Sequence, residues 1–214
     1  MTRRTLARFV RATVIALAAA GALGATLGLE GCGQQPPSFS NLDITGNTQF
    51  GNDFSLPDSN GKTRTMADFK GKVVVLFFGY THCPDVCPTT MAELSQALQQ
   101  LGPDADKRVQ VIFVSVDPER DTPQILGQYV NAFNPTFIAL RPADDAQLKQ
   151  VTKDFRVYYA KVPGKTPDGY TMDHTAASYV FDTTGKLRLF ARDGQGVTPW
   201  VHDLKILLGS NDGN

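Results

Sequence analysis

The sequence has no net charge and few residues of the types that bind soft metals. Lys plus Arg and Asp plus Glu each total 21 in 214 residues, whereas cysteine and histidine occur three times each. A chain without net positive charge lacks the attraction by which proteins hold a nucleic-acid backbone. The chain also lacks the repeated long apolar segments of a polytopic membrane protein. We therefore exclude nucleic acid as a partner and a polytopic membrane architecture.

The length and composition are those of one globular domain with an N-terminal appendage. Hydrophobic residues make up 42% of the chain and charged residues 20%, which is neither a disordered nor a fibrous composition. Four arginines precede residue 12, and the chain from Cys32 onward carries seventeen basic and twenty acidic residues. We expect a mildly acidic domain that follows a basic N-terminal segment.

Residues 1–31 have the features of an export signal. Basic residues up to Arg11 are followed by an uncharged stretch at 12–29. The sequence Leu29-Glu30-Gly31-Cys32 resembles a bacterial lipobox, in which the cysteine is acylated, although Glu30 departs from that pattern. We expect either lipid attachment at Cys32 or an uncleaved signal anchor. Both tether the domain to a membrane, facing the periplasm or an equivalent extracytoplasmic space.

A flexible tether is expected over residues 32–49, because this stretch is polar, contains proline and has little apolar material to bury. The folded domain is expected over residues 50–214. It begins with a β-hairpin made of residues 54–57 and 62–65, for which Asn60-Gly61 supplies the tight turn.

Buried strands and amphipathic helices alternate in the middle of the domain. Residues 73–78 are all apolar, and shorter continuous apolar runs follow at 111–114 and 137–140. A strand that is apolar on both faces belongs in the centre of a sheet covered by helices. Between these strands, apolar residues recur at helical spacing, at Met91, Leu94, Leu98 and Leu101 and then at Ile125, Tyr129 and Phe133.

The end of the domain follows a different pattern. We predict an antiparallel hairpin made of residues 178–181 and 187–190, followed by a last helix at 201–208. Alternating strands and helices followed by such a hairpin give the order of an α/β thioredoxin-like sandwich, here with an N-terminal β-hairpin extension. A flavodoxin-like sheet is the alternative, but that fold would continue with parallel crossovers instead of a hairpin.

Two cysteines, Cys83 and Cys87, follow directly after the predicted central strand. Ligands and reactive groups collect at this edge in open α/β folds. A helix that starts here places both residues on one face and favours their thiolates, although Pro88 indicates that the regular helix begins only there. A staple disulfide is the structural alternative, but it would close a loop too short to contribute much stability. The pair therefore indicates a thiol-disulfide oxidoreductase or a metal site.

The spacing and the histidines favour copper. Thioredoxin-type redox sites have two residues between their cysteines, and here there are three. Thiolates prefer Cu(I), and an imidazole as third ligand also admits Cu(II). His82 is expected to point away from the sulfurs, and His202 falls in the predicted last helix. His174 is expected in the loop that faces the cysteines, where a thioredoxin-like fold normally has a cis-proline, and residues 168–198 contain no proline. We predict His174 as the third ligand.

Three motifs together resemble the Sco/SenC family of copper-binding proteins, which assist cytochrome c oxidase assembly. They are Gly-Tyr-Thr-His-Cys-Pro-Asp-Val-Cys-Pro-Thr-Thr at 79–90, Val-Ser-Val-Asp-Pro-Glu-Arg-Asp-Thr at 114–122 and Asp-His-Thr at 173–175. The resemblance runs from about residue 50 to residue 208. It implies a thioredoxin-like fold and membrane attachment, with copper held as Cu(I) or Cu(II) by Cys83, Cys87 and His174.

The resemblance also implies partners. Copper would pass to the Cu(A) centre of cytochrome c oxidase subunit II, with another periplasmic copper chaperone as its donor. Asp117 falls in the Val-Asp-Pro loop of the second motif. It is expected near the site as a hydrogen-bond acceptor and not a ligand, or else as a cap or turn residue before a helix near Thr122. Residues 161–169 are expected to form a mobile loop suited to docking.

A membrane-tethered thiol-disulfide reductase, which keeps the Cu(A)-site cysteines reduced, is the alternative function. Cys83 or Cys87 would attack a disulfide and the other would resolve the mixed disulfide, so the two would form a redox-active pair. His174 discriminates between the two functions, because a reductase needs no third metal ligand. A peroxidase is disfavoured, because neither cysteine motif contains an arginine to activate peroxide.

Overall fold

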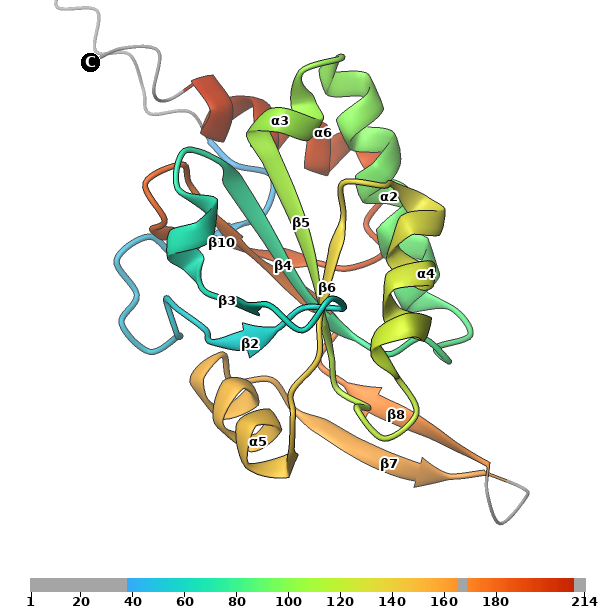
Figure 1. Ribbon diagram of the computed structural model, residues 1–214. Coiled ribbons are helices and arrows are strands. Elements are labelled where there is room, and N and C mark those ends of the chain that lie inside the picture. The colour runs from blue at the N-terminus through green and yellow to red at the C-terminus, as the bar shows by residue number, and fades with distance from the viewer. Residues whose placement is uncertain (1–37, 165–168, 210–214) are drawn as a thin grey trace, which may run out of the picture. The chain divides into compact units, whose positions relative to one another are not determined.

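The structure is a computed structural model that describes residues 38–164 and 169–209 (Figure 1). The predicted export signal at 1–31 and the candidate lipid site Cys32 lie outside these described residues. Within the described part of the chain, no helix combines the length and the apolar character needed to cross a membrane.

Six strands form the central sheet, in the order β1-β10-β9-β4-β5-β6. β4, β5 and β6 run parallel to one another, whereas β9, β10 and β1 are each antiparallel to their neighbours. Every residue of β4 and β5 is buried, as their continuous apolar runs predict. The strands are β1 Leu42–Asp43, β4 Val73–Gly79, β5 Val109–Ser115, β6 Ile138–Leu140, β9 Ala177–Phe181 and β10 Leu187–Arg192.

Three helices lie on one face of the sheet, namely α2 Val86–Leu101, α4 Pro123–Phe133 and α6 Val197–Gly209. α2 joins β4 to β5 and α4 joins β5 to β6, so right-handed crossovers place both helices on the same side, where Figure 1 shows them next to each other. α6 packs against α2. The shorter helices are η1 Met66–Phe69, α3 Ala105–Arg108 and α5 Asp145–Asp154.

This arrangement is a thioredoxin-like sandwich, and the antiparallel β9 and β10 exclude the flavodoxin-like alternative. Aromatic side chains fill both faces of the sheet. Phe77 of β4 contacts Phe113 of β5 on one face, and the adjacent Phe78 contacts Phe155 on the other. Successive strand residues point to opposite faces, which explains why this pair serves two cores.

The helical spacing locates α4 correctly but gives its buried face incompletely. Leu126 and Val130 are the fully buried residues of this helix, and Thr122 caps its N-terminus by accepting the Ile125 N–H at 3.2 Å. Ile125 itself, which we placed on the packing face, is 38% exposed. The prediction is wrong at this residue because Ile125 lies in the first turn, at the margin of the apolar stripe.

The N-terminal part of the domain is larger than the sequence predicts. The expected hairpin forms from β2 Leu56–Pro57 and β3 Thr63–Arg64, with Gly61 at the positive φ of +81° that its turn requires. Residues 42–43, assigned to the flexible tether, instead form β1 against the edge of β10, and Ile44 is buried. The fold therefore includes the last part of the segment 32–49. A two-residue strand is too short to produce a recognisable alternation in the sequence.

A second two-stranded sheet was not predicted. β7 Tyr159–Pro163 and β8 Tyr170–His174 form a hairpin that extends away from the central sheet (Figure 1). Residues 161–163, which we expected in a mobile loop, belong to β7, and residues 165–168 lie outside the described ranges. The hairpin is exposed along much of both strands, so it lacks the apolar alternation by which sequence analysis finds strands.

Candidate metal centre

Cys83 and Cys87 lie at the carboxyl end of β4, where the chain turns into α2. Cys83 is in the connecting loop and donates its N–H to Tyr80 O at 3.2 Å, whereas Cys87 is the second residue of the helix. The Cys87 N–H points at Cys83 Sγ, 3.5 Å away. Pro88 fits inside this first turn, where backbone N–H groups have no helical acceptor. The helix thus begins two residues before the position that Pro88 led us to expect.

The two thiols have different environments. Cys83 is partly exposed and Cys87 is fully buried, and both are free thiols. Cys83 Sγ accepts hydrogen bonds from the Cys87 S–H and from two backbone N–H groups. These bonds stabilise the thiolate and lower the pKa of Cys83 to about 5. The same hydrogen bond and burial raise the pKa of Cys87. Cys83 is therefore the thiolate of the pair at neutral pH.

Alkylation should reveal this difference. Because the pKa of Cys83 falls from an ordinary 9.0 to about 5, its reaction rate with iodoacetamide should stay high from pH 8 to pH 6 and fall by half only near pH 5. Cys87, buried and protonated, should react only after unfolding. Mass spectrometry of the reduced chain after timed pulses measures both rates. A half-point near pH 9 for Cys83, as in the unfolded chain, would contradict this assignment.

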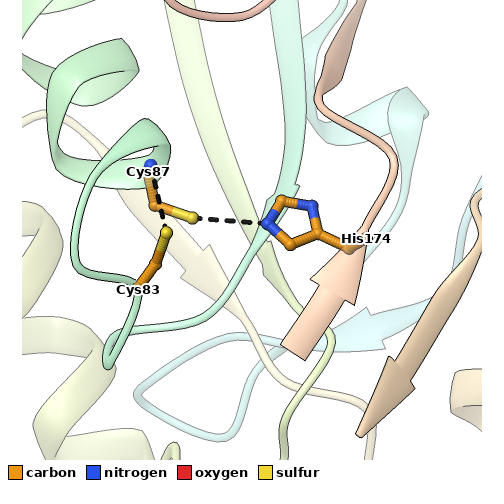
Figure 2. A group of neighbouring side chains, drawn as sticks. All are labelled: Cys83, Cys87 and His174. Atoms are coloured by element: carbon orange, nitrogen blue, oxygen red, sulfur yellow. Dashed lines mark hydrogen bonds between the residues drawn. The ribbon is translucent and has the colours of Figure 1, made fainter. Parts of the chain in front are cut away.

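His174 completes the cluster from the far side. It is the last residue of β8, and its ring points at the cysteines (Figure 2), with Nε2 3.6 Å from Cys87 Sγ. Nδ1 lies 3.0 Å from the backbone oxygen of Thr175, which only accepts, so Nδ1 donates there and Nε2 is the ring nitrogen that faces the sulfurs. The ligand atoms of Cys83, Cys87 and His174 all lie within 4.8 Å of one another.

The other two histidines lie outside this cluster. His82 is exposed, and its Nδ1 contacts Thr81 Oγ1 at 3.1 Å. His202 is exposed on α6, where its Nδ1 lies 2.8 Å from Asp203. Each therefore interacts with its sequence neighbour, and of the three histidines only His174 reaches the sulfurs.

Asp117 is buried one layer behind the cluster. Its Oδ2 accepts from Arg120 Nε at 2.5 Å, and its Oδ1 accepts from the Tyr170 hydroxyl at 2.8 Å. The Arg120 guanidinium faces the Tyr80 ring, which meets His174 edge-on at 5.9 Å. Asp117 thus accepts hydrogen bonds in the neighbourhood of the site, and it is separated from His174 by two intervening side chains.

The structure adds Gly79 and Asp121 to the residues that form the site. A Cβ on Gly79 would lie 2.9 Å from Cys87 Sγ, so only glycine at this position lets the backbone of β4 lie this close to the sulfur. The carboxylate of Asp121 is fully buried, and it accepts the hydroxyls of Thr81 and Ser115, each at 2.6 Å. It thereby attaches the cysteine loop to the end of β5. Both residues stand inside the quoted motifs, but only the fold shows what they contact.

Family comparison agrees with this geometry. The SCO1/SenC family model matches residues 43–209, which is most of the chain. The chain belongs to the SCO1/SenC family. A bovine relative, the mitochondrial protein SCO2 homolog, is 37% identical over 177 residues, which make up 82% of this chain and 66% of that protein. This SCO1/SenC chain spans about half to two thirds of the length of the curated relatives from cattle, mouse and fission yeast.

Two solved structures of SCO1/SenC proteins are similar to this chain. Bradyrhizobium japonicum ScoI with copper bound has a TM-score of 0.63 and 45% identity, and the match covers 73% of this chain and 98% of that one. Arabidopsis thaliana ScoI with copper bound has a TM-score of 0.67 and 33% identity, with 74% of this chain and 98% of that one covered.

The donor set suits a soft metal ion. Two cysteine sulfurs and one imidazole nitrogen favour copper over hard cations, which prefer oxygen ligands. Cys83 is already ionised at neutral pH, whereas Cys87 must lose its proton before its sulfur can bind a metal ion. Cys83, Cys87 and His174 thus form a group that could hold a soft metal ion.

Proposed function

We propose that this protein binds copper through Cys83, Cys87 and His174 and delivers it to the Cu(A) centre of cytochrome c oxidase subunit II during oxidase assembly. The observation that carries the proposal is the convergence of these three donor atoms within 4.8 Å of one another, at the end of β4. The similarity to ScoI proteins solved with copper bound supports the same metal.

Delivery would proceed by ligand exchange. Cys83 and His174 are partly exposed, so an incoming thiolate can approach the copper from their side while buried Cys87 still holds it. Each new sulfur ligand then replaces one of this chain, with no change in the number of electrons on the metal. Another periplasmic copper chaperone would supply the ion, and residues 1–31 or a lipid on Cys32 would tether the domain to the membrane, facing the extracytoplasmic space.

Reduction of the Cu(A)-site cysteines is the second candidate, and the low pKa of Cys83 favours it. The Cys83 thiolate would attack a target disulfide, forming a mixed disulfide and releasing one target thiolate. Cys87 would lose its proton and attack Cys83, which releases the second target thiolate and leaves a Cys83–Cys87 disulfide. The target gains two electrons, and an external dithiol must later reduce this chain.

Copper titration of the reduced full chain and a His174→Ala variant tests the proposal. We expect one Cu(I) per chain in competition with a chelator, and a thiolate-to-Cu(II) charge-transfer band that is lost or greatly weakened in the variant. His202→Ala is the matched control, because that histidine is exposed and outside the cluster, and it should bind copper like the parent.

The two functions give opposite results for the His174→Ala variant. A reductase needs no imidazole ligand, so disulfide turnover should survive the substitution while tight, three-ligand copper binding is lost. If the parent fails to compete with the chelator and the variant behaves identically, the metal site is wrong, and the thiol-disulfide reductase becomes the supported function.

A further inference from the structure

The β7–β8 hairpin, which carries His174, is attached to the domain by contacts other than strand pairing. In the described ranges, its two strands pair only with each other. His174 pairs with Tyr159 at the base of the hairpin. The position of the His174 ring relative to the cysteines therefore depends on side chains that join this hairpin to the rest of the fold.

One loop supplies several of these contacts. The loop between β5 and α4 contains Asp117, Glu119 and Arg120, and each of them bonds to the hairpin. Arg120 Nη1 donates to the backbone oxygen of Tyr170 at 2.8 Å, and the Tyr170 hydroxyl donates to Asp117 at 2.8 Å. Glu119 forms an ion pair with Lys161 on β7.

Arg120 occupies the centre of this contact. Its guanidinium carbon lies 3.5 Å from the centroid of the Tyr170 ring and 5.8 Å from that of Tyr80. Nε bonds to Asp117, while Nη2 is buried without a hydrogen-bond partner among the described residues. The guanidinium is therefore held by two aromatic faces and by two directed hydrogen bonds, a geometry that lysine cannot reproduce.

The Tyr80 ring connects Arg120 to His174. It meets the His174 ring edge-on, with centroids 5.9 Å apart at 89°, and its hydroxyl oxygen accepts the N–H of Met172 in β8. Arg120 thus touches both the strand that carries His174 and the ring that packs against it. It touches neither sulfur in any contact of the described residues, so it acts on the site only through its neighbours.

We propose that Arg120 is a positioning residue that fixes the β7–β8 hairpin so that His174 reaches Cys83 and Cys87. The inference rests on the proposed copper function, because it assigns a reason for three-ligand binding at that site. Loss of Arg120 leaves both thiols in place and allows the His174 ring to move away from them. Copper then remains bound by the sulfurs and leaves more rapidly.

Arg120→Gln in the full chain tests this inference. We expect one copper per chain, a Cu(II) charge-transfer spectrum shifted toward that of His174→Ala, and transfer of Cu(I) to a chelator about tenfold faster than in the parent. Arg120→Lys should give a spectrum and a transfer rate between those of the parent and of Arg120→Gln, because it keeps the charge opposite Asp117 and loses the bond to Tyr170.

Arg64→Gln is the matched control. Arg64 bonds to Asp58 with side-chain exposures of 25% and 3%, close to the 21% and 1% of Arg120 and Asp117, but it lies in the β2–β3 hairpin. The Arg64→Gln variant should therefore have the copper spectrum and the transfer rate of the parent. In a His174→Ala background, Arg120→Gln should add no further effect on transfer. An equal effect in both backgrounds, or a parental spectrum in Arg120→Gln, would overturn the proposal.

Hydrogen exchange separates this inference from the proposed function. Arg120→Gln should speed amide exchange at least tenfold in residues 159–163 and 170–174 without changing exchange in β4 and β5. This measurement needs no metal, so it tests the contact even if the parent binds no copper. Unchanged exchange in the hairpin would refute the positioning role, whatever the copper titration shows.

Discussion

Replacing Gly79 with valine is expected to remove tight copper binding and to lower the free energy of unfolding by about 3 kcal/mol. A Cβ at this position would lie 2.9 Å from Cys87 Sγ, 2.9 Å from the Phe77 ring and 3.0 Å from the Phe113 ring. All three neighbours are fully buried, and a core at crystal-like density has no free space for the added atoms. The overlap must move Cys87 relative to His174.

Denaturant unfolding and chelator competition measure the two effects. The thermal midpoint should fall by roughly 6–12 °C, since each kcal/mol corresponds to about 2–4 °C in a domain of this size. Gly209→Val is the matched control, because a Cβ on Gly209 meets no atom within 4 Å. Gly79→Ala provides a milder change if the valine variant does not fold. Parental copper affinity in a folded Gly79 variant would show that Cys87 need not hold its present position.

The sequence predicts the fold where long apolar runs or turn residues mark an element. The runs at 73–78 and 111–114 become β4 and β5, and the Asn60-Gly61 turn forms its hairpin. The sequence pattern does not predict β1 or the β7–β8 hairpin, for different reasons. β1 has only two residues, and the hairpin exposes most of its side chains, so neither carries a periodic apolar pattern.

The site was predictable to the extent that its residues have characteristic chemistry. Cysteine and histidine are rare in this chain, so Cys83, Cys87 and His174 could be selected and brought together through the expected fold. Arg120 could not be assigned in this way. Its importance comes from stacking between two tyrosines that are 90 residues apart in sequence, and no local pattern encodes that contact.

Replacing Asp193 with asparagine is expected to stabilise the domain by roughly 2–4 kcal/mol at pH 8 and to have little effect near pH 4. Asp193 is 6% exposed between β10 and α6. One of its oxygens accepts the Ser178 hydroxyl at 2.7 Å, and the other has no partner among the described residues. Burial, with the nearby charge of Glu93 adding to it, raises the pKa of Asp193 to about 7.

The sign of the effect follows from proton binding. Between pH 3.8 and about 7 the folded chain holds the Asp193 proton and the unfolded chain has lost it, so stability falls as the pH rises. Above pH 7 the folded domain carries a buried charge near Glu93 and Cys87. Asparagine keeps an acceptor for Ser178 and carries no charge, so it removes this destabilisation only where the carboxyl would be ionised.

Unfolding of parent and variant in denaturant at pH 4, 6 and 8 tests the sign. Asp182→Asn is the opposite control. Asp182 is also buried, but bonds from Thr184 and Arg188 help lower its pKa, so its charge stabilises the fold near neutral pH and this contribution is lost as the pH falls. The two variants should therefore shift stability in opposite directions at pH 8. At pH 4 Asp193→Asn should match the parent, whereas Asp182→Asn should still be destabilised, because the pKa of Asp182 lies below 3.8. A pH-independent effect of Asp193→Asn would mean that the carboxyl does not titrate near neutrality, and that its buried oxygen has a hydrogen-bond donor in solution.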